Sequence, residues 1–232
     1  MRGPAIIKRM ANRAYLSFWC KEFGESAMLD RFESLLETAP LSQVAAGFSS
    51  LLVRAVSPSE APVLERELHA TAADAADVVA LMREYAHADC SYEVSAHWDL
   101  WVYDAADDQW RLGAEPLEIA CLGEQYDEEA WREVGHFWIC AGFEHLFTGH
   151  AGLLGAAPIE VGQRHPAESE FLERMRRPNR LEEYRQKTQE NIRKLMTWVE
   201  QIDRALPVDR WRAWSEGEAN FESRLESILA GK

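Results

Sequence analysis

The chain has 232 residues, of which 47% are hydrophobic and 28% charged, and its formal net charge is -14 at pH 7. This length and composition predict a folded protein that buries a substantial core. Glu, Arg or His interrupts every apolar stretch well before the roughly 18 to 20 residues that a membrane-spanning helix needs, so we expect no membrane partner.

The acidic excess lies entirely in the first two thirds of the chain. Residues 1–159 contain 25 Asp and Glu against 11 Lys and Arg, whereas residues 160–232 contain 14 of each. An acidic surface repels phosphate backbones, so we expect no direct nucleic-acid binding and favour basic proteins or cations as partners. Solubility alone is the simpler explanation of such a surface.

The N-terminal segment is expected to lie outside the fold. Lys8 and Arg9 interrupt its short apolar patch before it reaches the length of a signal-peptide core, and no small-residue cleavage site follows. Met10 stands directly before the first strand pattern. We therefore expect residues 1–9 to be a loose tail or a mis-assigned start, and the protein to be unsecreted.

Residues 10–157 are predicted to form an acidic α+β sheet domain. Alternating apolar residues predict strands at 14–20, about 48–57, about 62–69, 91–104, about 116–123 and about 135–143. Helical spacing follows the possible N-caps Ser26 and Thr71. The order strand, helix, strand, strand, helix, strand is that of a ferredoxin-like unit, an antiparallel sheet with helices on one face. The two later strands extend this expectation to six strands.

Residues 158–232 are predicted to form a helical C-terminal region. A short helix is expected before Pro178, and apolar residues then recur every three or four positions until Pro207. A last amphipathic stretch covers roughly 217–229. We expect these helices to pack on the sheet or on another subunit, and a homodimer held by the helical stripe is one alternative for the whole protein.

The four cysteines indicate a reducing compartment. They are widely separated and form no C-x-x-C pair, and three of them lie in apolar strand patterns, where thiols behave as small buried hydrophobic groups. A sparse set of this kind does not resemble a secreted disulfide scaffold. We therefore expect a cytoplasmic protein.

Strand alternation places several histidines, carboxylates and tryptophans on one face of the predicted sheet. If the later strands are neighbours, this face combines His97, Asp99, Glu118 and His136 with Trp101 and Trp138. Imidazoles and carboxylates are suitable ligands for zinc or manganese. We expect that the protein holds no cofactor. The alternative hypothesis is a metal-dependent hydrolase with His97, Asp99, Glu118 and His136 as ligands.

Two further histidines stand in the segment GHFWICAGFEHLFTGHAGLLG. The spacing of five residues between His145 and His150 does not bring both side chains to one helical face, and no HExxH or His-x-His element is present. The segment therefore predicts a wall of the protein in preference to a metal site. The Gly and Pro residues between 149 and 166 indicate a flexible connection between the two regions.

We expect a binding or interaction protein in preference to an enzyme. No phosphate-binding glycine loop or serine elbow is present, and we nominate no catalytic residue. Tryptophan favours recognition surfaces because it contributes a large contact area and a polar N–H. We therefore predict that Trp101, Trp138, His97 and Tyr103 contact a basic protein partner, as in an inhibitor or immunity-type protein that neutralises a cationic toxin.

Overall fold

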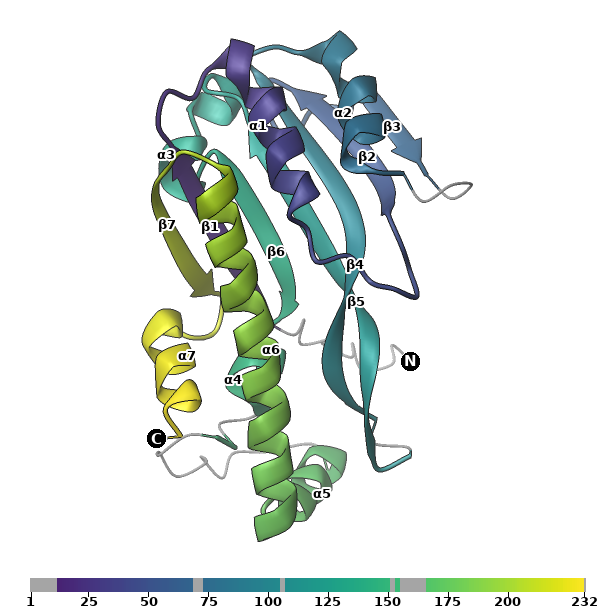
Figure 1. Ribbon diagram of the computed structural model, residues 1–232, viewed down its shortest axis with the longest axis vertical. Coiled ribbons are helices and arrows are strands. Elements are labelled where there is room, and N and C mark those ends of the chain that lie inside the picture. Colours follow the sequence, from purple (N-terminus) through teal and green to yellow (C-terminus); the bar gives the residue numbers. More distant parts are fainter. Residues whose placement is uncertain (1–11, 69–72, 105–106, 151–152, 155–165, 232) are drawn as a thin grey trace, which may run out of the picture.

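The computed structural model describes residues 12–68, 73–104, 107–150, 153–154 and 166–231, shown in Figure 1. The predicted tail at residues 1–9 and the predicted boundary between residues 157 and 158 lie outside these ranges.

Within the described residues, seven strands form one antiparallel sheet. They are β1 Arg13–Cys20, β2 Phe48–Ala55, β3 Leu64–Glu67, β4 Cys90–Asp104, β5 Gln109–Leu122, β6 Phe137–Phe143 and β7 Val208–Ser215. Their order across the sheet is β3-β2-β4-β5-β6-β1-β7. The predicted α+β class is confirmed, and the sheet is larger than the six strands expected. The ferredoxin-like arrangement is not confirmed, because β5 and β6 separate β1 from β4.

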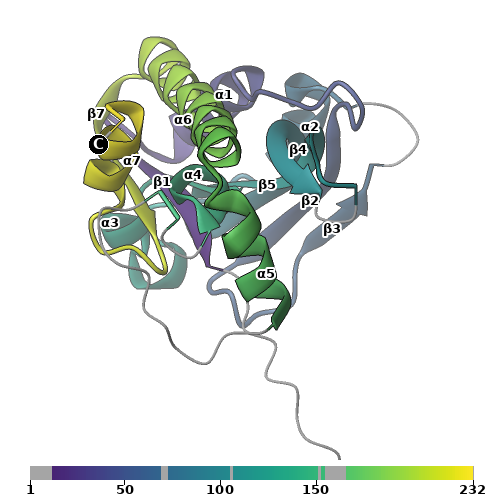
Figure 2. The same cartoon turned by 90° about the horizontal axis from the view of Figure 1, so that it is seen from below.

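The described helices gather mainly on one face of this sheet and at one end of it. They are α1 Glu25–Glu37, α2 Ala75–Met82, α3 Trp131–Val134, α4 His145–Thr148, α5 Pro166–Met175, α6 Pro178–Ala205 and α7 Phe221–Leu229, with 3-10 turns at Arg83–Tyr85 and Tyr126–Glu128. Figure 2 shows α1 and α6 together on one side of the sheet. No helix in the described ranges is long and apolar enough to cross a membrane.

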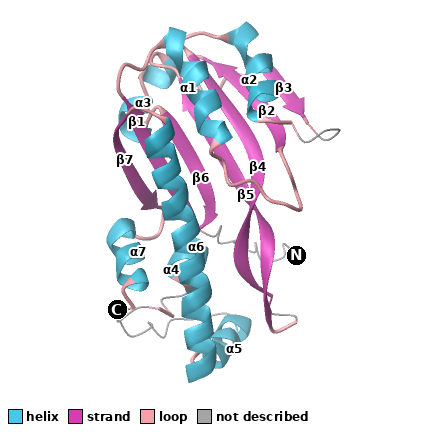
Figure 3. Cartoon of the chain, in the orientation of Figure 1, coloured by secondary structure: helices cyan, strands magenta, loops and turns pink. Residues whose placement is uncertain are grey.

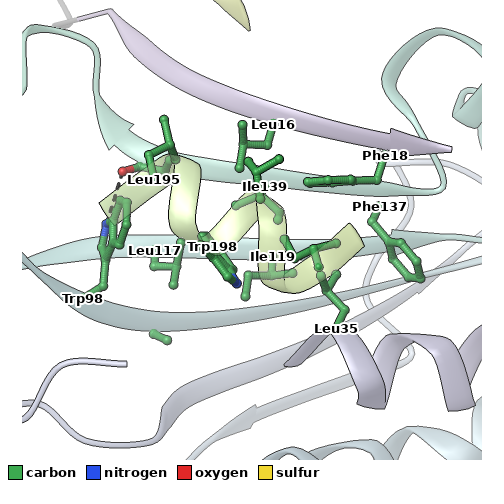
Figure 4. Packing of buried hydrophobic residues seen from close by; sticks show 14 of the residues in the cluster. Leu16, Phe18, Leu35, Trp98, Leu117, Ile119, Phe137, Ile139, Leu195 and Trp198 are labelled. Carbon is green, nitrogen blue, oxygen red and sulfur yellow. Dashed lines mark hydrogen bonds between the residues drawn. The ribbon is translucent and has the colours of Figure 1, made fainter. Parts of the chain in front are cut away.

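The main core lies between the sheet and these helices. On β4 the predicted apolar face is buried, and Trp98 at its centre is 1% exposed. The Trp98 ring packs 5.8 Å from the ring of Trp198 on α6, and its indole N–H donates to the carbonyl oxygen of Ala141 at 3.2 Å (Figure 4). The apolar stripe of α6 thus packs on the sheet. Burial of large apolar side chains in this layer contributes most of the stabilising free energy.

Strand β7 is a feature that the sequence pattern did not predict. It pairs with β1 from Ala14 opposite Ser215 to Cys20 opposite Val208. In the C-terminal region we expected helices only, because charged residues and half-exposed tryptophans in β7 obscure the alternation of an edge strand. The C-terminal region therefore contributes a strand to the sheet that the N-terminal region builds.

The hairpin of β4 and β5 extends beyond the rest of the sheet (Figure 3). Strand β2 pairs with β4 only as far as Ala96, and β6 pairs with β5 only as far as Glu118. Beyond these residues the two strands continue to pair with each other up to Asp104 opposite Gln109. Helix α6 runs alongside this projection, so the region between the hairpin and α6 has side chains from several distant segments.

Candidate functional site

A cavity of about 190 Å³ lies where the hairpin meets α4, α5 and α6. It is lined by Trp101, Val102, Tyr103, Trp110, His145, Leu146, His150, Phe171, Tyr184, Thr188 and Asn191. Ligand sites are commonly concave, mostly apolar and lined by aromatic side chains with a few placed polar groups. This cavity has that composition, so we treat it as the candidate site.

Aromatic rings from four elements form most of the wall. Trp110 on β5 meets Tyr103 on β4 edge to face at 5.4 Å and Tyr184 on α6 at 5.2 Å. Phe171 on α5 lies 5.6 Å from Tyr103 and 6.2 Å from Tyr184. Edge-to-face contacts are the favourable geometry for aromatic quadrupoles, so these rings hold one another in place and present a rigid apolar wall.

Two histidines complete the wall on the α4 side. The ring of His145 meets the ring of His150 edge to face at 5.7 Å, and His150 meets Phe171 in the same way at 5.4 Å. Burial lowers the pKa of His145 to about 4, and the neighbouring His150 adds to this effect. Above that pKa, His145 contributes a neutral imidazole, which can both donate and accept a hydrogen bond.

Tyr184 supports the same wall from the helix. Its hydroxyl oxygen accepts a hydrogen bond from the backbone N–H of His150 at 2.9 Å, and the residue is 4% exposed. Burial raises the pKa of Tyr184 to about 12, so the phenol stays protonated near neutral pH. Tyr184 therefore fixes the position of His150 without adding charge to the cavity.

One donor in the wall has no hydrogen-bond partner among the described residues. The indole N–H of Trp110 is buried, and within the described residues it makes no hydrogen bond. A buried donor without an acceptor costs roughly 1 to 3 kcal/mol, so such groups usually have a role or an additional partner. Because this nitrogen has almost no accessible surface, an acceptor atom on a bound molecule would reach it only after a neighbouring side chain moves.

Asn191 joins the cavity to the hairpin. Its side-chain oxygen accepts a hydrogen bond from the backbone N–H of Trp101 at 2.8 Å, and its amide nitrogen donates to the carbonyls of Trp101 at 3.0 Å and Leu146 at 3.1 Å. These bonds replace a strand neighbour at Trp101, because β2 pairs with β4 only as far as Ala96 and Leu41 forms a bridge only at Trp98. Asn191 thereby holds β4, α4 and α6 in one arrangement around the cavity.

Charged side chains at the rim contact one another and the aromatic wall. The Tyr103 hydroxyl donates to Asp108, whose carboxylate lies 2.7 Å from Arg180 and 3.5 Å from Arg174. The Tyr103 contact and the two guanidinium groups hold the pKa of Asp108 below its usual value. On the other side, the ammonium of Lys187 lies 3.5 Å from the centre of the Trp101 ring. The rim thus fixes two aromatic residues.

The four residues predicted to contact a partner lie at three places in the structure. Trp101 and Tyr103 line the cavity. His97 lies opposite Pro116 in the hairpin, and Trp138 lies on β6, where its ring stacks on Tyr15 at 5.2 Å. A shared contact of these four residues with a partner stays a prediction.

The four candidate metal ligands are distributed along the length of the sheet, and His136 directly precedes β6. Asp99 lies opposite Ala114 in the middle part of β5, and the carbonyl of His136 accepts from the N–H of Leu122 at the end of β5. Eight residues of strand separate these two levels, which is about 26 Å at 3.3 Å per residue. Within the described ranges, no group of three or more His, Cys, Asp or Glu side chains could hold a metal ion.

Three of these four residues have other side-chain contacts. Asp99 accepts from the Ser42 hydroxyl at 2.6 Å and so holds the loop before β2. Glu118 lies 3.8 Å from Arg13. His136 is stacked between Phe23 at 4.1 Å and Trp131 at 4.4 Å, which places it in a buried aromatic layer.

Comparison with protein-family models, with curated proteins and with solved structures finds no match for this chain.

Sequence reasoning missed most of the cavity. It selected Trp101 and Tyr103 for their aromatic character, but Trp110, Phe171 and Tyr184 come from three other elements. The helical stripe did contain Tyr184 and Thr188, which periodicity assigns to packing. A signal was available in the unusual presence of a tyrosine and a threonine among the aliphatic residues of that stripe.

Proposed function

We propose that this chain is a small-molecule-binding protein whose ligand is a neutral, planar aromatic compound with one hydrogen-bond acceptor. The observation that carries the proposal is the cavity between the β4–β5 hairpin and α6, with the unpartnered indole N–H of Trp110 in its aromatic wall. A cavity with convergent polar groups in an apolar lining is the usual form of a ligand site.

The size of the cavity supports a small ligand. A dry engineered cavity of about 150 Å³ in another protein accommodates benzene, so about 190 Å³ suits one aromatic ring with a small polar substituent. The surrounding rings of Tyr103, Trp110 and Phe171 favour a flat apolar body, because their faces and edges offer dispersion and quadrupole contacts.

The charge of the lining supports a neutral ligand. His145 is neutral above pH 4, Tyr184 is protonated, and Asn191 and Thr188 carry no charge. Transfer of an ion from water into such a lining would be costly without an opposite charge. Asp108 already pairs with two arginines at the rim, so it supplies no excess charge.

Isothermal titration calorimetry with three one-ring compounds tests this assignment. Benzamide has a carbonyl acceptor, toluene has the ring alone, and benzoate has the ring with a negative charge. We expect benzamide to bind most tightly, toluene more weakly and benzoate weakest, because only benzamide satisfies Trp110 without burying a charge. Equal binding of all three compounds, or binding of none, contradicts the proposal.

The expected basic protein partner stays a separate prediction. The acidic excess of residues 1–159 still favours it, but Trp101 and Tyr103 line the cavity instead of an open surface with Trp138. Salt dependence of association with a cationic protein such as lysozyme tests it, because electrostatic steering weakens as ionic strength rises.

A further inference from the structure

The sheet has a second face, opposite to α1 and α6, on which charge is unevenly distributed. Cross-strand partners in the antiparallel sheet lie on the same face, so the pairing register identifies two complete rows across all seven strands. The first row is Glu65, Leu52, Glu93, Ala120, Trp138, Ser17 and Arg212, and the second is Glu67, Ser50, Ser95, Glu118, Cys140, Tyr15 and Trp214.

The β3 half of this face is acidic. Glu65 and Glu67 are exposed on β3, and Glu93 follows on β4. Burial raises the pKa of Glu93, which is a sign that its carboxylate has little water around it. Glu65 makes no ion pair within the described residues.

The β7 half is aromatic and basic. Trp138, Tyr15 and Trp214 form a stacked series, with ring centres 5.2 Å and 4.3 Å apart. Arg212 lies beside Trp214 at 5.5 Å and Arg210 lies over Trp19 at 4.1 Å. Arg212 donates to the carbonyl of Glu133, and no carboxylate within the described residues pairs with it.

These two halves are complementary under a two-fold rotation. Strand β5 is the middle strand of the seven, so an axis along β5 places β3 of one copy over β7 of the other and β4 over β6. The level along the strands is preserved by such a rotation. Glu65 and Arg212 belong to the same row. Glu65 of each copy would therefore lie opposite Arg212 of the other copy, so that the contact occurs twice, as an isologous interface requires.

We propose that the protein forms a two-fold symmetric dimer in which these sheet faces pack on each other, with Glu65 of one copy paired with Arg212 of the other. The same rotation places Glu93 over Trp138 and Glu67 over Trp214. Glu118 lies near the axis, where Arg13 at 3.8 Å offsets its charge. Aligned packing of two sheets at about 10 Å is a common arrangement of this kind.

This dimer is distinct from one held by the C-terminal helices and does not depend on the cavity. Helix α6 is packed on the other face of the sheet, where Trp198 contacts Trp98. The occupant of the second face is a copy of the same chain because Glu65 and Arg212, which form no ion pair within the described residues, carry opposite charges in one sequence. Charge complementarity between the two ends of the first row also fixes the orientation of the copies.

Sedimentation equilibrium of the full chain tests the dimer. We expect a dimer at micromolar concentration whose dissociation constant increases with salt, and an increase of about tenfold or more for each of E65R and R212E, because each creates two like-charge contacts. R204E on α6 is the matched control, since it reverses an exposed arginine away from this face, and we expect no change. Circular dichroism confirms that each variant is folded.

Mixing the two variants separates the proposed pairing from a general charge effect. In a mixed pair of E65R with R212E, both contacts again join opposite charges, so we expect a heterodimer of nearly wild-type affinity. A wild-type protein that is monomeric up to several hundred micromolar overturns the proposal. A dimer that R212E leaves unchanged, or a mixture that does not restore association, overturns it as well.

Discussion

The side chain of Asn191 on α6 binds both backbone polar groups of Trp101 on β4, with hydrogen bonds of 2.8 Å and 3.0 Å. Because β2 ends its pairing at Ala96, the edge of β4 at Trp101 would otherwise leave these partly buried groups without a protein partner. The amide of Asn191 thus makes the two hydrogen bonds that a neighbouring strand would make, and it connects the hairpin to the helix that lines the cavity.

We predict that Asn191→Leu lowers the free energy of unfolding by about 3 kcal/mol, since it leaves one buried and two partly buried backbone groups without their partner. Urea denaturation measures this change. Gln189→Leu is the control, because Gln189 on the same helix donates to carbonyls at the end of α7 and accepts only from the exposed side chain of Arg193, and we expect a loss below about 1 kcal/mol. If both variants lose the same free energy of unfolding, the proposed contribution of the Asn191 hydrogen bonds is wrong.

Trp110→Phe is predicted to weaken benzamide binding about tenfold and to leave toluene binding nearly unchanged. Phenylalanine keeps an aromatic ring against Tyr103 and Tyr184 but removes the N–H that has no partner within the described residues. Calorimetric titration of both compounds provides the comparison. A parallel loss for both compounds would show that the ring, and not the donor, determines affinity.

His136 is predicted to make stability depend on pH. Burial lowers its pKa from 6.5 to about 4, because the ring lies between Phe23 and Trp131. Between these two pKa values the unfolded chain binds the proton more readily than the folded one. Stability is therefore fully present above about pH 6.5 and falls as pH decreases toward 4, by roughly 2 to 3 kcal/mol from this group.

The variant His136→Phe isolates this contribution. The variant lacks the titrating group, so protonation of His136 lowers the stability of the wild type only. The difference in free energy of unfolding between wild type and variant should therefore narrow or reverse as pH falls from 7 to 4.5. Titration of the carboxylates affects both proteins equally and does not change this difference. The substitution also removes the acceptor for the Cys20 N–H at 3.0 Å, which lowers stability by a constant amount. Denaturation curves at three pH values that differ by a constant offset would refute the role of His136.

The sequence predicts the parts of the fold that periodicity governs. The stripe of Tyr184, Ile192, Leu195 and Ile202 is buried on α6, and the apolar face of β4 is buried around Trp98. The local sequence pattern is sufficient to predict these buried faces, because each element has one face covered by other parts of the protein and one face that is not. The pattern also assigned Glu118 and His136 to one sheet face, although it gave no information on their separation along the strands.

Features that depend on tertiary pairing were not predictable in this way. Strand β7 has half-exposed residues on both faces, so its short alternation does not stand out from a loop. The cavity combines Trp110, Phe171 and Tyr184, whose proximity follows from the hairpin projecting beside α6. Neither the strand order nor the length of the β4–β5 hairpin is encoded in a local pattern.

The position of β7 leads to a further prediction. Ala213 is 4% exposed and lies opposite Leu16, so Ala213→Asp should lower the free energy of unfolding by about 3 kcal/mol because it buries a carboxylate. Asp209→Ala changes an exposed residue of the same strand and should have an effect below about 0.5 kcal/mol. Thermal or urea unfolding measures both, and an Ala213→Asp protein as stable as wild type would contradict the pairing.

The most direct test of the binding site is calorimetric titration of benzamide into wild type, Thr188→Phe and Thr197→Phe. Thr188 lines the cavity and is 3% exposed, whereas Thr197 lies exposed on the same helix, so the same substitution fills the cavity in one case only. The account predicts that Thr188→Phe abolishes binding and that Thr197→Phe binds as wild type does. Unchanged binding in a folded Thr188→Phe protein would contradict the assignment of the cavity.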